Sequence, residues 1–430
     1  MSILIKNAQV LPMTAEEIIC GDILIAGDKI AAIGVVDPAL ISGEEKIINA
    51  EGHLAMPGLI NAHTHAAMTL LRSYADDLEL MSWLNDEIWP AEDKMGAEDI
   101  YWGTMLAIAE MIRGGTTTFA DMYGPFMEKV AQAVTESGIR ASLAHGCVGV
   151  SDPNEQKIAE NIALYEEYNN SADGRIKVWF GPHAPYTCSS AYLEKLAQAA
   201  WDHHSGIHVH LSETKDELRQ IRENYNLSPV EYLAKVGIFD GPCLAAHGVW
   251  LNDEEIAYLA ERKVSVVHNA VSNMKLSSGA APVAKMLKMG LNVGLGTDGA
   301  SSNNSLDMFK EMSTAAYLSK LATMEPTSVK AFEALQMATI GSARALGWDK
   351  EIGTLEVGKK ADLILVDLIA PHFCPWNNSI ADLVYSAKST DVTHTIVNGK
   401  LLMENRELLT LDLPLIMKNA QKCAKRITTK

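Results

Sequence analysis

The chain has few cysteines, and they are not arranged to cross-link the protein or to hold a structural metal. Six cysteines are scattered over 430 residues, and no two of them form a Cys-x-x-Cys pair. Disulfide-rich secreted domains and zinc ribbons both need closely spaced cysteines. We therefore expect reduced thiols and a cytoplasmic protein. The first residues fit this expectation, because they show no charged leader followed by an apolar core.

Positive charge and long apolar runs are also scarce. Lys and Arg number 36 against 54 Asp and Glu, which gives a net charge of -18. Such an acidic chain is a poor match for a nucleic-acid backbone or an anionic membrane, so we expect neither as a partner. No apolar run reaches the roughly 18 residues of a membrane span. The hydrophobic share of 48% is enough to build a large core.

Strand-like and helical patterns alternate from residue 57 onward, which is typical of a βα-repeating fold. Eight strand-like segments within about 250 residues match the size of a (β/α)8 TIM-type barrel. The alternative is a doubly wound open sheet, which usually has a Gly-rich nucleotide loop after its first strand; we find none. The longest connection, residues 66–115, is interpreted as a lid or substrate loop. The predicted strands are 58–61, 116–120, 140–144, 177–180, 206–210, 243–246, 264–267 and 292–296.

Both ends of the chain have β-like patterns separated by turns. Asn398-Gly399 is a strong signal for a hairpin turn. The simplest interpretation is that residues 1–56 and 349–430 meet in one small β-sandwich domain, which also carries a C-terminal helix over about 413–426. Residues 57–348 would then form the barrel.

Histidines gather where the predicted barrel strands end. The first strand runs into His63 and His65, whose side chains point to the same side of an extended chain. In a barrel the carboxyl ends of the strands meet on the face that carries the chemistry. This clustering predicts a metal site. The other polar strand-end residues are His183, His208, His210, His247, His268 and Asp298.

A hydrolytic metal site needs nitrogen and carboxylate ligands and a nearby proton shuttle. Asp298 can bind a metal through one oxygen and accept a proton from water through the other. Glu213 follows His210 by three residues and can face the same cavity. Simpler roles stay open: Glu213 could cap the next helix, Asp298 could belong to an ordinary turn, and His208 and His268 could pack behind the ligands.

These motifs resemble the amidohydrolase superfamily, and within it the 5′-methylthioadenosine/S-adenosylhomocysteine deaminases, a branch that also contains triazine hydrolases. The resemblance covers nearly the whole chain. It rests on Pro57-Gly58-Leu59-Ile60-Asn61-Ala62-His63-Thr64-His65, Gly181-Pro182-His183-Ala184-Pro185-Tyr186, His208-Val209-His210-Leu211-Ser212-Glu213-Thr214, Ala246-His247-Gly248, Ser272-Asn273-Met274-Lys275-Leu276 and Gly296-Thr297-Asp298-Gly299.

The resemblance implies one metal ion per subunit, usually Zn²⁺, with Fe²⁺ or Mn²⁺ as alternatives. Its ligands would be His63, His65, His210 and Asp298. No strand offers a bridging lysine, so a single metal is favoured. By the same resemblance Glu213, His247 and Asp298 would be catalytic: Glu213 protonates the ring nitrogen, His247 orients the attacking hydroxide, and Asp298 accepts its proton.

The resemblance also implies a substrate. A glutamate at the position of Glu92 binds the ribose hydroxyls and a histidine at the position of His183 touches the nucleoside, beside Glu213 and Asp298. A vicinal diol suits a carboxylate acceptor, although Glu92 could instead begin or cap a helix. The family often uses an arginine after the third strand for the homocysteine carboxylate, and residues 147–165 contain none. Methylthioadenosine and adenosine are therefore favoured over S-adenosylhomocysteine.

The predicted function is metal-dependent hydrolytic deamination of these adenine nucleosides to the inosine analogue and ammonia, by a homo-oligomer. The alternative is another aminohydrolase or chlorohydrolase of the same branch, acting on guanine, triazine or pyrimidine rings.

Overall fold

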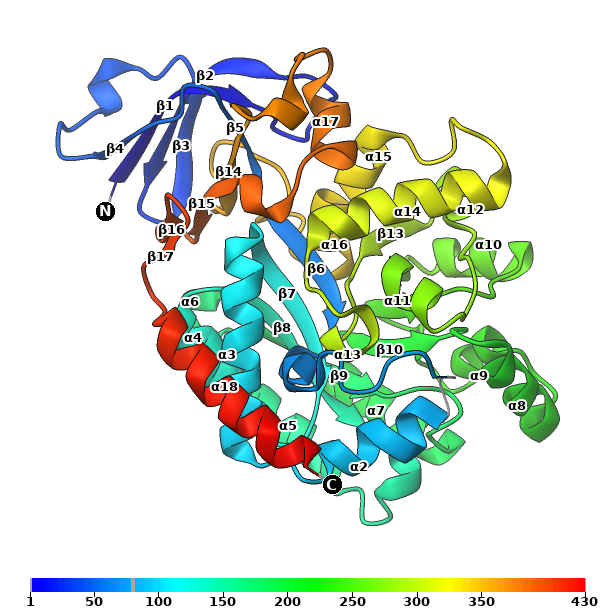
Figure 1. The fold of residues 1–430 in the computed structure, drawn as a ribbon. Coiled ribbons are helices and arrows are strands. Elements are labelled where there is room, and N and C mark those ends of the chain that lie inside the picture. The colour runs from blue at the N-terminus through cyan, green and yellow to red at the C-terminus, as the bar shows by residue number, and fades with distance from the viewer. Residues whose placement is uncertain (1, 79–81, 430) are drawn as a thin grey trace.

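The computed structural model describes residues 2–78 and 82–429, and it contains two sheets (Figure 1). One of them is an eight-stranded parallel sheet whose strands lie in chain order. All eight predicted barrel strands are confirmed. They are β6 (Leu59–Thr64), β7 (Thr116–Tyr123), β8 (Arg140–Cys147), β9 (Ile176–Pro182), β10 (Ile207–Leu211), β11 (Cys243–His247), β12 (Ser265–His268) and β13 (Asn292–Leu295).

Side chains bring the first and last strands of the barrel together. The amide of Asn61 donates to the Thr297 hydroxyl at 2.7 Å, and its carbonyl oxygen accepts from the Thr297 backbone at 2.9 Å. A Cβ on Gly296 would lie 2.7 Å from the backbone nitrogen of His63, so only glycine permits this approach. The ring of strands is thereby nearly closed, as a TIM-type barrel requires.

Helices surround the barrel and follow its strands (Figure 1). The main ones are α3 (Ala97–Arg113), α4 (Met127–Ser137), α5 (Gln156–Tyr168), α7 (Ser190–Asp202), α8 (Lys215–Tyr225), α9 (Pro229–Lys235), α10 (Asp253–Glu261), α11 (Ala270–Lys275), α12 (Val283–Lys288), α13 (Ala300–Asn303), α14 (Met308–Thr323), α15 (Ala331–Gln336) and α16 (Ser342–Ala345). Among the described residues, no helix is long and apolar enough to cross a membrane.

The connection after β6, interpreted from the sequence as a lid or substrate loop, is mostly helical over its described residues. It contains a 3-10 helix (Ala66–Leu71), a π-helix (Trp83–Ile88) and α2 (Trp89–Glu92), and it continues into α3. Trp83 and Ile88 are buried. Apolar side chains at helical spacing pack this segment against the barrel, which is why it forms helices.

Both ends of the chain form one mixed sheet of nine strands, which confirms that the two β-like ends meet. Strand β14 pairs with β5, and β15 and β16 form the hairpin predicted at Asn398-Gly399, both of which have a positive φ. The strands are β1 (Ser2–Val10), β2 (Ile19–Ala26), β3 (Lys29–Gly34), β4 (Lys46–Asn49), β5 (His53–Pro57), β14 (Leu363–Asp367), β15 (Val392–Val397), β16 (Lys400–Glu404) and β17 (Glu407–Leu408). Helices α17 (Ser379–Tyr385) and α18 (Leu413–Thr428) belong to the same C-terminal part.

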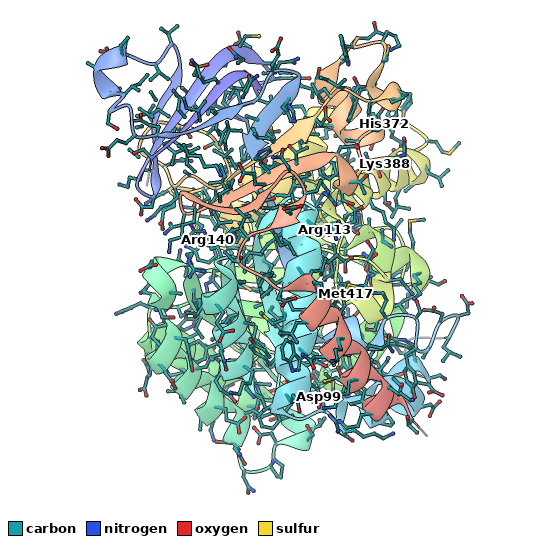
Figure 2. All side chains as sticks on the ribbon, turned by 60° about the vertical axis from the view of Figure 1, so that its left-hand side comes forward. Asp99, Arg113, Arg140, His372, Lys388 and Met417 are labelled. Carbon is teal, nitrogen blue, oxygen red and sulfur yellow. The ribbon has the colours of Figure 1, made fainter. Side chains whose placement is uncertain are left out.

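A buried ion pair joins the two sheets. Arg140, at the start of β8, donates from Nε to Asp362 at 2.8 Å and from Nη2 at 3.1 Å, and both side chains are almost fully buried (Figure 2). Asp362 also accepts from the backbone of Asn398 at 2.7 Å. Breaking one side of such a pair would leave a charge buried alone. We propose domain boundaries after residues 56 and 348, beside this junction.

Candidate active site

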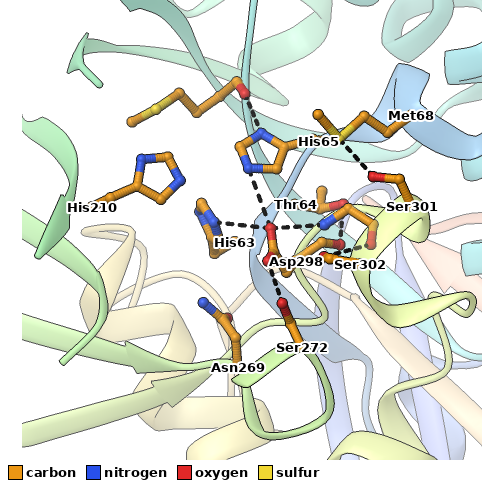
Figure 3. A network of polar contacts seen from close by, with 12 residues as sticks. His63, Thr64, His65, Met68, His210, Asn269, Ser272, Asp298, Ser301 and Ser302 are labelled. Atoms are coloured by element: carbon orange, nitrogen blue, oxygen red, sulfur yellow. Dashed lines mark hydrogen bonds and ion pairs between the residues drawn. The ribbon is translucent and has the colours of Figure 1, made fainter. Parts of the chain in front are cut away.

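Strands on both sides of the barrel place histidines and one carboxylate around a common point (Figure 3). His63 comes from β6 and His65 directly follows it, His210 comes from β10, and Asp298 lies just after β13. The ligand atoms of His63, His65 and Asp298 all lie within 4.8 Å of one another, as do those of His63, His210 and His247. The spacing suits a single metal ion that shares these donors.

The carboxylate of Asp298 is held in one orientation. Its Oδ1 lies 3.2 Å from Nε2 of His65 and 3.5 Å from Nε2 of His63. Its Oδ2 accepts hydrogen bonds from the Ser272 hydroxyl at 2.6 Å and the Ser302 hydroxyl at 3.0 Å. Burial alone would raise the pKa of Asp298, but hydrogen bonds from His63 and His65 hold it well below its usual range. Asp298 is therefore ionised at neutral pH.

Three histidines have one ring nitrogen held by the protein, which leaves the other facing the centre. The Nδ1 atom of His65 donates to the carbonyl of Met122 at 2.6 Å, and that of His210 donates to the carbonyl of His183 at 2.7 Å. Carbonyl acceptors at Nδ1 place the proton there and leave the lone pair on Nε2. Both rings are thus in the tautomer that binds a metal through Nε2.

His63 is oriented in the same way by another histidine. Its Nδ1 lies 2.8 Å from Nε2 of His208. His208 is buried and lies two residues before His210 in β10. The Nε2 of His63 is buried and faces Oδ1 of Asp298 at 3.5 Å, a contact at the limit of hydrogen-bond length. A buried ring nitrogen with only such a weak contact can bind a metal ion at little cost.

Burial controls the protonation of these rings. It lowers the pKa of His63 to about 4 and that of His210 well below its ordinary value, so both are neutral at pH 7. Burial also disfavours charge on His65, but its hydrogen bond to Asp298 raises the pKa to about 9. Metal ions replace protons on their ligands, and the proton shared by His65 and Asp298 is the one a cation here would replace.

Glu213 and His247 form a second functional pair in the same cavity. Nε2 of His247 lies 3.8 Å from Oε2 of Glu213, and Nδ1 of His247 lies 2.9 Å from the side-chain oxygen of Asn273. Burial raises the pKa of Glu213, which favours its protonated form. Glu213 does not cap the following helix, because the Thr214 side chain is the N-cap of α8. Glu213 is thus free to face a substrate.

Glu92, at the end of α2, lines the same cavity as the strand-end histidines. The Tyr123 hydroxyl donates to Oε1 of Glu92 at 2.5 Å. Burial raises the pKa of Glu92 to about 7. The cavity brings together most of the predicted site residues, namely His65, Glu92, His183, His210, Glu213, His247 and Asp298, while His63 lies buried beneath it.

Several functional contacts were not predicted from the sequence. Tyr123 is the clearest, although its position at the end of the second barrel strand was a usable signal. His145 is not at this centre: its Nε2 lies 2.9 Å from Glu160, and it lines an adjoining cavity of about 540 Å³ that shares Glu92 and Tyr123 with the first. His268 is buried nearby, and its Nδ1 has no hydrogen-bond partner in the described part of the chain.

Comparison with known proteins agrees with this geometry. The sequence model of the amidohydrolase family matches residues 54–402. The 5-methylthioadenosine/S-adenosylhomocysteine deaminase of Pelotomaculum thermopropionicum is 51% identical over 100% of this chain and 99% of its own. The 5'-deoxyadenosine deaminase of Methanosarcina mazei is 48% identical over 100% and 99%.

A solved structure is similar over the full length. The adenosine deaminase from Xanthomonas campestris with bound zinc has a TM-score of 0.94 and 36% identity, over 100% of this chain and 99% of that one.

Proposed function

Since this chain belongs to the amidohydrolase family, we propose that it is a metal-dependent hydrolytic deaminase of adenine nucleosides. Its substrates would be 5′-methylthioadenosine, S-adenosylhomocysteine or adenosine, and its products the inosine analogue and ammonia. One observation carries the proposal: the Glu92–Tyr123 pair lines the same cavity as Glu213, His247 and Asp298. A carboxylate that can accept hydrogen bonds from a ribose diol therefore lines the same cavity as the residues proposed for hydrolysis.

The proposed metal ligands are His63, His65, His210 and Asp298. The donor set fits a divalent ion, because nitrogen and carboxylate ligands with one open position are the usual surroundings of catalytic zinc. The buried Nε2 of His63, which faces the Asp298 carboxylate at 3.5 Å, supports the fit. We propose Zn²⁺, one per subunit, with Fe²⁺ or Mn²⁺ as alternatives of similar ligand preference. Such an ion supplies hydroxide at neutral pH by lowering the pKa of water to about 7.

The remaining chemistry belongs to the side chains. Asp298 is ionised and accepts the proton of the attacking water, and His247, held by Asn273, orients that water. Burial raises the pKa of Glu213 and so favours the acid form, which would donate its proton to the ring nitrogen beside the amino-bearing carbon. The water oxygen forms a bond to that carbon, Asp298 passes the proton it accepted to the amino group, and the carbon–nitrogen bond breaks to release ammonia. The remaining hydroxyl proton returns to Glu213, which leaves the carbonyl of the inosine analogue.

Glu92 is proposed to bind the ribose. Its carboxylate accepts from two vicinal hydroxyls, while the Tyr123 hydroxyl holds its orientation. His183 lines the same cavity, with its ring centre 4.8 Å from that of His210, and it is neutral because burial lowers its pKa to about 3. Its Nδ1 lies 3.1 Å from the Thr187 hydroxyl, which leaves Nε2 for the nucleoside. Trp83 and Trp89 add apolar ring surface.

The adjoining cavity is proposed to receive the 5′ substituent. It has a volume of about 540 Å³ and shares Glu92, Tyr123 and Val148 with the active-site cavity, so a substituent on a ribose held by Glu92 can extend into it. Apolar side chains such as Met95, Ile100 and Val148 line part of it and suit a methylthio group. Among the described residues that line this cavity, Lys157 is the single lysine or arginine. It would be the one cation available to the carboxylate of a homocysteine substituent.

An absorbance assay tests the proposal. Metal-loaded protein is incubated separately with methylthioadenosine, S-adenosylhomocysteine, adenosine, guanine and a chlorotriazine. We expect loss of adenine absorbance with the nucleosides, and ammonia in equal amount. Turnover of guanine or the chlorotriazine without turnover of any nucleoside would reject the proposal in favour of the other branch activities. We also propose a cytoplasmic homo-oligomer, whose mass light scattering would measure.

A further inference from the structure

A separate cavity of about 290 Å³ lies on the outside of the barrel and shares no lining residue with the active-site cavities. Three parts of the chain meet there: the C-terminal end of α3, the segments on either side of β15 and β16, and the start of α18. Figure 2 shows Arg113 at the end of α3 and Met417 on the neighbouring C-terminal helix. The proposed deaminase reaction uses none of these residues.

Arg113 brings a cation into this cavity without a matching anion. Its Nε is buried and has no hydrogen-bond partner among the described residues, and its guanidinium makes no ion pair with them. Glu110 lies one turn earlier but is already engaged, because it pairs with Arg72 and accepts from the backbone of Leu306 at 2.9 Å. A buried N–H donor without an acceptor loses its hydration and gains nothing in return.

Arg406 brings a second cation to the same place. Its Nη1 donates to the carbonyls of Arg113 at 2.6 Å, Ser389 at 2.9 Å and Val392 at 2.8 Å. Burial lowers the pKa of Arg406, and the charge of Arg113 lowers it further. The nearby carboxylate of Asp391 opposes this effect, but it is also engaged, with His372 at 2.9 Å and the Lys388 backbone at 2.8 Å.

The two arginines differ in the hydrogen-bond acceptors that the described residues provide for them. The three carbonyl acceptors explain Arg406 as a residue that joins β15 to the end of α3. They do not explain Arg113, whose side chain receives no acceptor in the described chain. An excess of positive charge in a cavity is notable on a protein whose net charge is -18. The apolar part of the lining comes from Leu106 on α3 and from Leu413 and Met417 on α18.

We propose that this cavity is a binding site for a small oxyanion, a carboxylate or a phosphate, held by Arg113 and Arg406. The planar guanidinium group donates in pairs to such oxygens, which is the geometry that both groups recognise best. The bound anion would satisfy Nε of Arg113 and reduce the repulsion between the two cations. It would also connect α3, the nine-stranded sheet and α18, so binding should stabilise the folded protein.

Calorimetric titration of the metal-loaded protein at constant ionic strength tests the site. Phosphate, sulfate and butyrate are titrated in turn, and their relative affinities separate a phosphate site from a carboxylate site. We expect saturable binding of at least one anion and a rise in melting temperature. Arg113→Gln should weaken binding about tenfold or more, because a charged hydrogen-bond donor is lost. Lys422→Gln removes the same charge from an exposed position on α18 and should leave the affinity unchanged.

Two results would overturn the proposal: no saturable binding of any of the three anions, or equal affinities for the two variants. Crystals of the unaltered protein soaked in selenate locate the anion even if Arg113→Gln does not fold. Anomalous signal between Arg113 and Arg406 supports the site, whereas signal confined to the His63 and Asp298 centre overturns it. Arg113→Lys keeps the charge but not the paired geometry, so we expect several-fold weaker binding; unchanged affinity would contradict the assignment.

Discussion

The Nδ1 atom of His63 lies 2.8 Å from Nε2 of His208, and both rings are buried. Burial lowers the pKa of both rings, so a single proton is shared between the two nitrogens at neutral pH. When that proton resides on His63 Nδ1, the Nε2 of His63 has a free lone pair that points at Asp298 and His65. His208 thus determines which nitrogen of His63 is available to a metal.

Replacing His208 by Ala should weaken metal binding by about 10- to 100-fold, which is the usual effect of losing a group that orients a ligand. Competition with a chelator measures this. His268→Ala is the matched control, because His268 is equally buried but is not hydrogen-bonded to any of the proposed ligands. Equal metal affinity of the two variants would show that His208 only fills space.

Replacing Glu92 by Ala should lower kcat/KM for methylthioadenosine by roughly 100-fold or more, because two hydrogen bonds from hydroxyls to a carboxylate are lost. The loss should be small for a 2′,3′-dideoxy substrate, which has no diol. Asp86→Ala removes an exposed carboxylate from the same segment and should leave the kinetics unchanged. Equal losses on both substrates would mean that Glu92 supports the fold rather than the ribose.

Arg426 should position Glu92 from a distance. Its Nη1 donates to the carbonyl of Lys94 at 3.1 Å, and its guanidinium pairs with Asp99, which also accepts from the Gly96 backbone at 2.7 Å. Arg426→Ala should therefore raise KM about two- to tenfold with little change in kcat.

Lys422→Ala, on the same helix, is the control for Arg426→Ala. The KM effect should vanish in a Glu92→Ala background if it acts through Glu92. An additive effect in the double variant would assign Arg426 to general stability instead.

Lys157 should affect long 5′ substituents more than short ones. Its Nζ donates to the Ser151 hydroxyl at 3.0 Å and lines the adjoining cavity. Lys157→Ala should lower kcat/KM for S-adenosylhomocysteine about tenfold, since a charged partner of the carboxylate is lost, and should hardly change methylthioadenosine. Lys195→Ala, an exposed lysine paired with Glu155, is the control. Parallel losses on both substrates would exclude contact with the homocysteine tail.

Glu217 should make stability depend on pH. Burial raises its pKa from 4.5 to about 8, against the effect of hydrogen bonds from the backbones of Ser212 and Glu213. The folded state therefore keeps a proton that the unfolded state releases, and this contribution is complete below pH 4.5 and is lost as the pH rises through 8. Between these values the free energy of unfolding should fall by up to about 1.4 kcal/mol per pH unit.

Denaturant unfolding at several pH values measures the Glu217 effect. Glu217→Gln, which resembles the protonated acid, should remove this part of the slope. The free energy of unfolding of the variant should therefore increase relative to that of wild type as the pH rises. Glu311 has a pKa raised by burial to about 8 as well, so Glu311→Gln should show a similar gain and serves as a comparison. Identical pH slopes for wild type and Glu217→Gln would contradict the assignment.

Much of the fold could be predicted because it follows from short-range patterns. The eight barrel strands are short apolar runs between helical patterns, and the Asn398-Gly399 turn is determined by residues that tolerate a positive φ. The connection after β6 was interpreted as a lid or substrate loop, and its Trp83, Trp89 and Glu92 line the active-site cavity. Its short helices before α3 were not predicted, because they depend on packing against the barrel.

The sequence by itself determined the kind of chemistry, because parallel barrel strands bring their carboxyl ends together. The residue at each strand end can be identified from its own short segment of sequence. Only the tertiary structure decided how those residues are held. His63 and His208 are 145 positions apart, and Glu92 meets Tyr123 through a helix and a strand that pack against each other. The same is true of Arg113 and Arg406, which are joined by the contact of α3 with the β-domain. Such partners depend on long-range packing, which no local pattern specifies.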